Sequence, residues 1–172
     1  MLSAIVLAPF GADPAAGRAQ EAAVRSLAAL VGAAIADIVR DACVVGAPGA
    51  GLASIADHAG CALVEDTEPA RGLAIALKKM RSDRIFLLAA GYAPMSGFID
   101  EMSDWSLAAV PPAMALRAEP ESLAQRIFPS LARCVGVVAA RSDMLAVAGD
   151  NPGAFARKLG ARTLLTRARR VV

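Results

Sequence analysis

The residues best placed for chemistry lie in the loop that follows an apolar strand expected at Arg84–Ala89. In parallel α/β proteins, ligands bind outside the carboxyl ends of the strands, so a catalytic group or a metal ligand belongs in such a loop. The loop instead begins with Ala90, Gly91, Tyr92 and Ala93. None of these side chains is a carboxylate, an imidazole or a thiol, so the sequence predicts a binding loop that lacks its acid.

Two glycine-bearing segments offer backbone groups rather than side chains. The turn GAPGAG at Gly46–Gly51 precedes a helix expected at Leu52–His58. Free N–H groups in this position bind anions, but glycine is also well tolerated in any tight turn, so both interpretations remain open. The segment Pro9–Gly17 follows the first strand and is followed by Arg18. It either contacts a nucleotide or forms a polar entry to a helix.

Three further groups have chemical uses. The acidic cluster Glu65–Glu68 follows an expected strand and suits either the ligand side of the sheet or a solvated helix start. Arg141 also follows a strand and could pair with a phosphate, while Ser142 fits an ordinary helix N-cap. His58 is the only histidine. No serine or cysteine partner is recognisable for it, so we expect a helix-surface residue rather than a general base.

The composition predicts one globular domain. With 172 residues and 56% apolar content, the chain can bury one sizeable core, so we expect a single domain over residues 1–172. The net charge is +2, and no nucleic-acid partner is expected. Basic residues collect at the carboxyl end, which is either a solvated end or a tail that attracts phosphate or an anionic membrane surface. They are Arg157, Lys158, Arg162, Arg167, Arg169 and Arg170.

The sequence gives no sign of a membrane span or of a disulfide framework. No uninterrupted apolar run reaches the roughly 18 to 20 residues needed to span a bilayer, and no basic leader precedes the first strand. We therefore expect a cytoplasmic protein without a transmembrane segment. Cys43, Cys61 and Cys134 are odd in number, far apart and without a CxxC pair, so buried thiols are expected rather than disulfides or zinc ligands.

The elements that would position these residues alternate along the chain. Apolar runs predict strands and three- and four-residue periodicity predicts helices. The expected strands are Ser3–Ala8, Ala42–Val45, Cys61–Glu65 and Arg84–Ala89, and the expected helices are Gln20–Ala36, Leu52–His58 and Ala70–Met80. On the first helix, Ala23, Val24, Leu27, Leu30, Val31 and Ala34 are expected to form the buried face. Apolar strands separated by helices imply an α/β fold whose mostly parallel sheet is flanked by helices.

The carboxyl-terminal half has a weaker pattern. Two prolines, Pro111 and Pro112, interrupt it. The expected helices are Ser96–Met102, Glu121–Ala132 and Ser142–Gly149. The expected strands are Leu107–Val110, at an edge, and Val135–Ala140, and Thr163–Thr166 is either a final strand or an extended tail. No internal repeat, linker or second domain is recognisable.

Five strings in this order resemble the family-two glycosyltransferases, which bind a nucleotide-diphosphate sugar. They are LSAIVLAPFG, RDACVVGAPGAGLASIADHAG, RGLAIALKKM, IFLLAAGYAPMSGFIDEM and GVVAARSDMLAVAGD. The resemblance implies a Rossmann-like nucleotide-diphospho-sugar transferase fold. It also implies that Pro9, Phe10 and Gly11 belong to the nucleotide loop.

The departures from that family decide the functional expectation. Gly46 and Gly51 stand where the family has acids that contact the nucleotide, and Gly91 stands where it has the metal-coordinating acid. Glycine cannot hold a divalent cation, so no cofactor is expected, and in particular no divalent metal such as manganese. The late acidic pair has no clear counterpart; Asp150 is the nearest carboxylate and the only catalytic candidate.

The sequence therefore predicts a pseudoenzyme that resembles the family. Its expected roles are residual binding of a nucleotide, a nucleotide sugar or an anion, or an interaction role that includes self-association into a homo-oligomer. The alternative is an active, metal-independent glycosyl- or nucleotidyltransferase with a nucleotide-sugar donor. In that case Arg18, Arg71 or Arg141 would take the place of the cation.

Overall fold

The computed structural model describes residues 1–10, 16–128 and 131–171. The strands are β1 (Leu2–Leu7), β2 (Val39–Gly46), β3 (Ala62–Glu65), β4 (Arg84–Ala89), β5 (Tyr92–Pro94), β6 (Met114–Ala118), β7 (Cys134–Ala140) and β8 (Arg162–Arg170). The helices are α1 (Ala16–Ile35), α2 (Leu52–His58), α3 (Pro69–Lys79), α4 (Phe98–Leu107), α5 (Leu123–Ile127), α6 (Arg141–Val147) and α7 (Pro152–Lys158).

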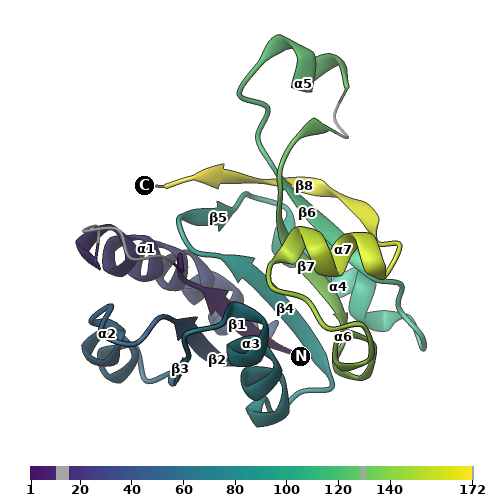
Figure 1. Cartoon of the computed structure of the whole chain (residues 1–172). Coiled ribbons are helices and arrows are strands. Elements are labelled where there is room, and N and C mark those ends of the chain that lie inside the picture. The colour runs from purple at the N-terminus through teal and green to yellow at the C-terminus, as the bar shows by residue number, and fades with distance from the viewer. Residues whose placement is uncertain (11–15, 129–130, 172) are drawn as a thin grey trace.

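All eight strands form one sheet in the order β3-β2-β1-β4-β7-β6-β8-β5 (Figure 1). β7 is antiparallel to both β4 and β6, and β5 is antiparallel to β8. The remaining pairs are parallel. The predicted α/β class, with a mostly parallel sheet flanked by helices, is confirmed.

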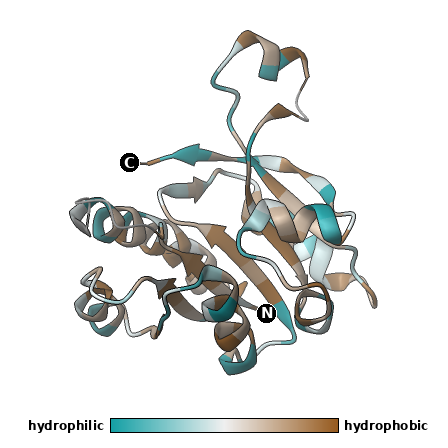
Figure 2. Ribbon diagram, viewed as in Figure 1, coloured by the Kyte–Doolittle hydropathy of each residue, from teal (hydrophilic) through white to brown (hydrophobic). Residues whose placement is uncertain are grey.

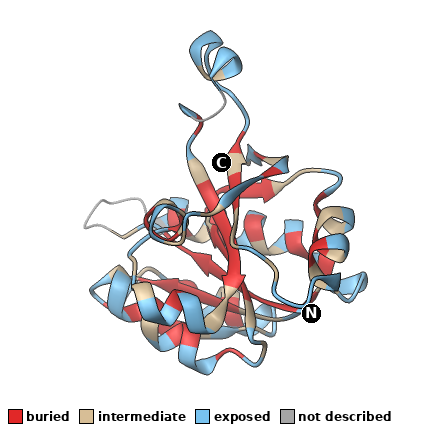
Figure 3. Ribbon diagram, turned by 90° about the vertical axis from the view of Figure 1, so that its right-hand side faces the viewer, coloured by how far each residue is buried: buried red, intermediate tan, exposed pale blue. Residues whose placement is uncertain are grey.

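Alternating side chains of the strands build two cores, one on each face of the sheet. Leu2, Ala4 and Val6 of β1 face a core that also contains Phe98, Met102 and Trp105 of α4 and Leu30 of α1. Ile5 and Leu7 face the opposite core with residues of α3, α6 and α7. The central strands are accordingly hydrophobic (Figure 2) and buried (Figure 3). Burial on both faces explains why their sequences are continuous apolar runs.

The amino-terminal half agrees with the expected elements, but the buried face of α1 differs. Its buried residues are Ala19, Ala22, Ala23, Ser26, Leu30 and Ala33, all of them small except Leu30. Val24 and Val31 are 48% and 54% exposed, and Ala34 is exposed as well. The predicted face was therefore right for Ala23 and Leu30 and wrong for Val24, Val31 and Ala34, because mainly small side chains let the helix approach the sheet closely.

The carboxyl-terminal half needs several corrections. Leu107–Val110 is no strand; it is the end of α4 and an exposed connection. The helix expected over Glu121–Ala132 is limited to α5 (Leu123–Ile127), none of whose residues is buried. The short strand β5, the strand β6 and the helix α7 were not predicted.

The basic carboxyl end is part of the fold. Arg157 and Lys158 lie in the last turn of α7, and the other four arginines lie on β8, which pairs with β6 and β5. Among the helices of the described ranges, none has the length and apolar character that a membrane crossing requires.

Candidate binding cleft

A cleft of about 1000 Å³ lies at the carboxyl ends of β1, β2 and β4. This is the edge where α/β sheets bind ligands. One side is formed by the start of α1 and the turn after β2, and the other by the segments that follow β6 and precede α7. Among the lining residues are Pro9, Phe10, Arg18, Ala47, Pro48, Gly49, Ala50, Ala90, Gly91, Tyr92, Glu119, Glu121, Arg133, Asn151 and Arg170.

The polar groups of the cleft have the chemistry of a phosphate site. Three arginines line it: Arg18 of α1, Arg133 just before β7 and Arg170 of β8, and all are exposed. A guanidinium presents a planar fork of donors that matches phosphate oxygens. Glu119 and Glu121 supply two carboxylates to the same cleft. The cleft therefore has cationic and acidic walls above an alanine- and glycine-rich floor.

Several of these residues were missed by the sequence reasoning. Glu119, Glu121 and Arg133 flank the connection between β6 and β7, and β6 was not predicted. Arg170 was assigned to a tail, although β8 brings it to the cleft. Tyr92 is the exception, because it follows the end of the predicted strand Arg84–Ala89, where the sequence predicts a binding loop.

Gly91 is held in a turn that requires glycine. Its φ of 87° lies in the left-handed region. Its N–H donates to Ser26 Oγ at 3.0 Å and to the Ala22 carbonyl at 3.2 Å. Its own carbonyl accepts from the Val171 N–H at 2.9 Å. The turn between β4 and β5 is thus bound to both α1 and the end of β8.

The two other glycines at expected acid positions are also enclosed. A Cβ on Gly46 would lie 2.3 Å from Leu52 Cδ1 and 3.2 Å from Ala8 Cβ. Gly51 has a φ of 69°, and a Cβ there would lie 1.8 Å from Gln20 Nε2. Gln20 Nε2 in turn donates to the Gly51 carbonyl at 3.2 Å. The buried Leu52 occupies the space that a side chain on Gly46 would need, whereas at Gly51 the obstacle is the positive φ, because the flexible Gln20 side chain can move aside.

The three arginines of the alternative mechanism do not converge. Arg18 lines the cleft, whereas Arg71 donates from Nε to Asp66 Oδ2 at 2.7 Å. Arg141 donates to the Met80 carbonyl and to Asp83 Oδ1, both at 2.6 Å. Asp83 lies at the end of the sheet opposite the cleft, because the next residue, Arg84, is the first residue of β4 and pairs there with Ala140 of β7. Arg141 therefore links segments at that end of the sheet and not at the cleft.

The remaining candidates have simple positions. Pro9 and Phe10 line the cleft, and Gly11 lies outside the described residues. Asp150 is exposed and accepts from Asn151 Nδ2 at 2.8 Å, while Asn151 Oδ1 caps α7 by accepting from the Ala154 N–H at 2.9 Å. Asn151 lines the cleft, so Asp150 lies next to the cleft.

His58 is exposed on α2, and its Nδ1 lies 2.6 Å from the Ser54 carbonyl oxygen.

Asp66 is the structural member of the acidic cluster. Its buried carboxylate accepts from the Glu68 N–H at 2.9 Å and from Arg71 Nε at 2.7 Å. The hydrogen bond from Arg71, followed by that from the Glu68 backbone, lowers the pKa of Asp66. This carboxylate therefore shapes the loop between β3 and α3.

Replacing Asp66 with asparagine is expected to lower the melting temperature at neutral pH. Because the folded-state pKa is lowered, the ionised carboxylate stabilises the protein above its unfolded-state pKa, and this contribution is lost as pH falls through the folded-state pKa. Melting curves recorded from neutral to acid pH should therefore converge for the two proteins. The exposed Asp104→Asn variant is the control. A difference that stays constant with pH would contradict this role.

The three thiols are free, and burial weakens their acidity. Burial raises the pKa of Cys43 to about 12. It also raises the pKa of Cys61 and of Cys134, which are only half-buried. Cys134 lines the cleft, so its alkylation rate can report whether the cleft is occupied.

Comparison with known proteins gives a fold but no family. The sequence matches no family profile and no curated protein. The structure resembles a nucleotidyl transferase from Methanothermobacter thermautotroptrophicus, with a TM-score of 0.55 and 15% identity over 100% of this chain and 88% of that one. It also resembles 4-diphosphocytidyl-2C-methyl-D-erythritol synthase, with a TM-score of 0.59 and 16% identity over 95% and 86% of the two chains.

A third similar structure is glucosyl-3-phosphoglycerate synthase from Mycobacterium tuberculosis in complex with Mn²⁺ and UDP-glucose. Its TM-score is 0.58, with 13% identity over 94% of this chain and 68% of that one. These likenesses establish the nucleotide-diphospho-sugar transferase fold, as the resemblance of the five strings implied.

The same comparison corrects the expectation about cofactors. We expected no divalent metal, but structures with this fold contain Mn²⁺ together with UDP-glucose, or Mg²⁺ together with UDP. The expectation was therefore wrong, because it rested on the single position Gly91. Across the described parts of this chain, no three histidine, cysteine, aspartate or glutamate side chains come together in a metal-binding group.

Proposed function

We propose that this chain binds a nucleoside diphosphate or a nucleotide sugar in the cleft at the carboxyl ends of β1, β2 and β4. The observation that carries the proposal is the set of three arginines, Arg18, Arg133 and Arg170, around one cleft at the ligand edge of this fold. A diphosphate carries several charged oxygens that arginine forks can bind in pairs. Similar structures hold UDP or UDP-glucose.

We further propose that the chain is a degenerate relative of the family-two glycosyltransferases that has lost transfer activity. The support is the environment of the three glycines: Gly51 and Gly91 have positive φ values that disfavour acidic residues, and a Cβ on Gly46 would collide with Leu52. The role of the protein is then ligand binding or interaction with a partner.

An active glycosyl- or nucleotidyltransferase remains the second candidate, because Glu119 and Glu121 bring carboxylates into the cleft. One of them would act as the base that activates an acceptor hydroxyl. Release of the nucleotide from a bound nucleotide sugar separates the two candidates. Turnover that disappears in Glu119→Gln or Glu121→Gln would favour the enzyme, whereas binding without turnover favours the degenerate protein.

Arg170→Ala is expected to weaken nucleotide binding by roughly 10- to 100-fold, since a hydrogen bond to a charged group contributes roughly 1.5–3 kcal/mol. Calorimetry with UDP, UDP-glucose and inorganic phosphate, each with and without Mn²⁺, measures the effect. Arg169→Ala is the matched control, because Arg169 is the exposed neighbour on β8 and does not line the cleft.

A second readout locates the ligand. Bound nucleotide should slow alkylation of Cys134 and leave that of Cys61 unchanged, because only Cys134 lines the cleft. Absence of binding for every nucleotide, with and without Mn²⁺, would overturn the proposed function. Equal losses in Arg169→Ala and Arg170→Ala would show that general charge, rather than this cleft, attracts the ligand.

A further inference from the structure

The connection between β6 and β7 exposes a set of large apolar side chains. We call α5 with Phe128 and Leu131 the arm. Figure 1 shows α5 projecting from the body of the molecule, and Figure 3 shows that its surface is exposed. Leu123, Ile127, Phe128 and Leu131 are 74%, 70%, 60% and 60% exposed. Apolar side chains gathered on a projecting segment are typical of an interaction site.

Capping at its start holds the arm as a helix. Ser122 Oγ accepts from the Gln125 N–H at 3.3 Å, and Gln125 Oε1 accepts from the Glu121 N–H at 2.8 Å. Such reciprocal bonds satisfy free N–H groups at a helix start. Leu123 and Ile127 lie four residues apart and therefore share one face of α5.

The strand β8 crosses the base of the arm. β6 ends at Ala118, and the N–H of the next residue, Glu119, donates to the Ala168 carbonyl of β8 at 2.8 Å. Arg169 and Arg170 follow Ala168 and are exposed, so they lie beside the first residues of the connection. Figure 1 shows β8 running across the foot of the arm, and this end of the strand is hydrophilic (Figure 2).

The base of the arm has an excess of positive charge. Residues 117–133 and 167–170 form the connection and the adjoining part of β8, and they contain six arginines and two glutamates. Arg126 lies on α5 itself. Arg133 is exposed where the chain returns to β7. The apolar side chains therefore lie at the projecting end, and cationic side chains lie beside and behind them.

We propose that the arm inserts into the interface of an anionic membrane surface. Its apolar side chains would enter the boundary between headgroups and acyl chains, and the arginines at its base would contact the headgroups. Segments that lie in a membrane interface combine an apolar face with basic residues in this way. Basic residues held near an anionic surface strengthen the attachment, and salt weakens their contribution.

A lipid surface suits the size of the arm better than a protein partner does. A stable protein interface buries roughly 800 Å² on each partner, more than a five-residue helix with Phe128 and Leu131 can supply. A bilayer needs no complementary shape, so each apolar side chain that enters it contributes separately. The excess of arginine selects an anionic surface over a neutral one.

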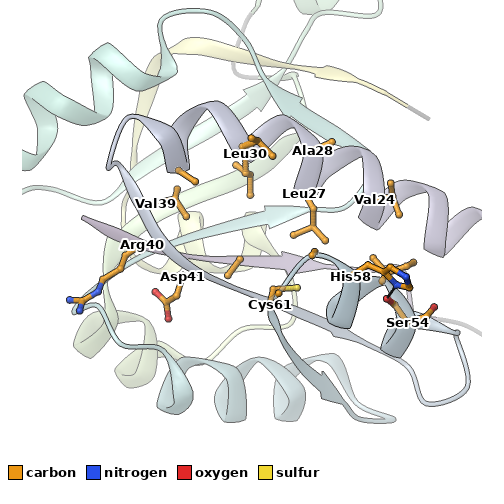
Figure 4. Close-up of a pocket in the computed structure, with 16 residues that line it drawn as sticks. Val24, Leu27, Ala28, Leu30, Val39, Arg40, Asp41, Ser54, His58 and Cys61 are labelled. Carbon is orange, nitrogen blue, oxygen red and sulfur yellow. Dashed lines mark hydrogen bonds between the residues drawn. The ribbon is translucent and has the colours of Figure 1, made fainter.

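A second exposed apolar surface differs from the arm in shape and in charge. It is a groove of about 600 Å³ between α1 and α2, and its lining includes Val31 (Figure 4). Arg40 and Asp41 both line it, so it has no excess of positive charge. It is also recessed, whereas the arm projects. The groove therefore provides a control position for the arm.

The inference is independent of the proposed function, because Ile127 and Phe128 do not line the cleft. Calorimetry with UDP in the absence of vesicles should give the same affinity for Ile127→Asp and for wild type. Failure of nucleotide binding and failure of membrane binding can therefore be told apart.

Sedimentation with vesicles tests the proposal. Wild-type protein should bind vesicles of equal parts phosphatidylcholine and phosphatidylglycerol at least tenfold more strongly than vesicles of phosphatidylcholine alone, and added salt should reduce the difference. Ile127→Asp should weaken binding to the anionic vesicles at least tenfold, since a charge replaces an apolar group that enters the interface. Arg126→Glu should weaken it about fivefold or more, the equivalent of roughly 1 kcal/mol for an arginine near the surface.

Matched variants away from the arm are the controls. Val31→Asp makes the same kind of change at a position in the groove that is 54% exposed. Arg162→Glu reverses an exposed charge at the start of β8, where the strand pairs with the first residue of β6 rather than with the last. Both should bind like wild type. All four positions are exposed, so the fold should persist, and circular dichroism checks it.

Fluorescence quenching measures insertion directly. The only tryptophan, Trp105, is buried in α4, so brominated acyl chains should leave wild-type fluorescence unchanged. Phe128→Trp adds a fluorophore to the arm, and its emission should be quenched by brominated lipid in anionic vesicles.

Several results would overturn the proposal. They are absence of binding to the anionic vesicles, equal binding to both kinds of vesicle, unchanged binding by Ile127→Asp, and an unquenched Phe128→Trp variant. Self-association of the lipid-free protein in analytical ultracentrifugation that Ile127→Asp abolishes would assign the arm to a second copy instead.

Discussion

Gly46→Asp is expected to destabilise the protein by about 3–5 kcal/mol, combining overpacking with the burial of an unpaired charge. A Cβ at this position would approach Leu52 Cδ1 to 2.3 Å. Leu52 is fully buried and packs with Ala8 and Val44, so it has little space in which to move. The measurement is chemical denaturation. Gly46→Ala, which adds the clash without the charge, should lose about 1–3 kcal/mol.

Gly17→Asp provides the matched control for this change. Nothing lies within 4 Å of a Cβ at Gly17, and the residue is exposed near the start of α1, where an acidic side chain is tolerated.

The double variant Gly46→Asp/Gly91→Asp should not gain manganese-dependent nucleotide binding, because its turns must distort. A stable double variant that binds nucleotide only with Mn²⁺ would show instead that the acids were lost from an otherwise intact site.

Ser26→Ala is expected to cost about 1–3 kcal/mol, the usual penalty for a buried group left without its hydrogen bond. Ser26 is fully buried in α1. Its Oγ donates to the Tyr92 carbonyl at 2.8 Å and accepts from the Gly91 N–H at 3.0 Å. Alanine removes both bonds. The Gly91 N–H keeps its bond to Ala22, so the loss falls mainly on the Tyr92 carbonyl.

The effect of Ser26→Ala should concentrate at the cleft. Hydrogen exchange should accelerate at Gly91 and Tyr92 more than in β1, because the variant loosens the turn rather than the centre of the sheet. Ser142→Ala, at an exposed position on α6, should leave both stability and exchange unchanged. Uniformly faster exchange, or an unchanged free energy of unfolding, would contradict the assigned role of Ser26.

The sequence was most informative where local pattern and tertiary packing agree. The bounds of α2 and β4 were predicted to the residue, since a glycine-rich turn and a buried apolar run define them. The pattern failed for α5, because apolar residues four apart predict a buried helix even where no partner covers them. For β8 the pattern found only Thr163–Thr166, because the arginines that follow hide the rest of a strand that pairs with β6 and with the short edge strand β5.

The site was predictable only in part for the same reason. Gly91, Pro9 and Phe10 follow predicted strands, so their position at the cleft could be expected. Glu119 and Arg170 reach it through β6 and β8, whose pairing joins residues about fifty positions apart in the sequence. No local pattern carries that information. The occupied space around Gly46 and Gly51 likewise depends on Leu52 and Gln20 packing in three dimensions.

The reversed direction of β7 has an evolutionary consequence. Because β6 and β7 are antiparallel neighbours, the connection between them leaves and re-enters the sheet at the cleft edge. Surface connections tolerate insertion and substitution much better than the strands that they join. Mutations in this one connection can therefore change the lining of the cleft, while the glycine floor and the two cores stay constant.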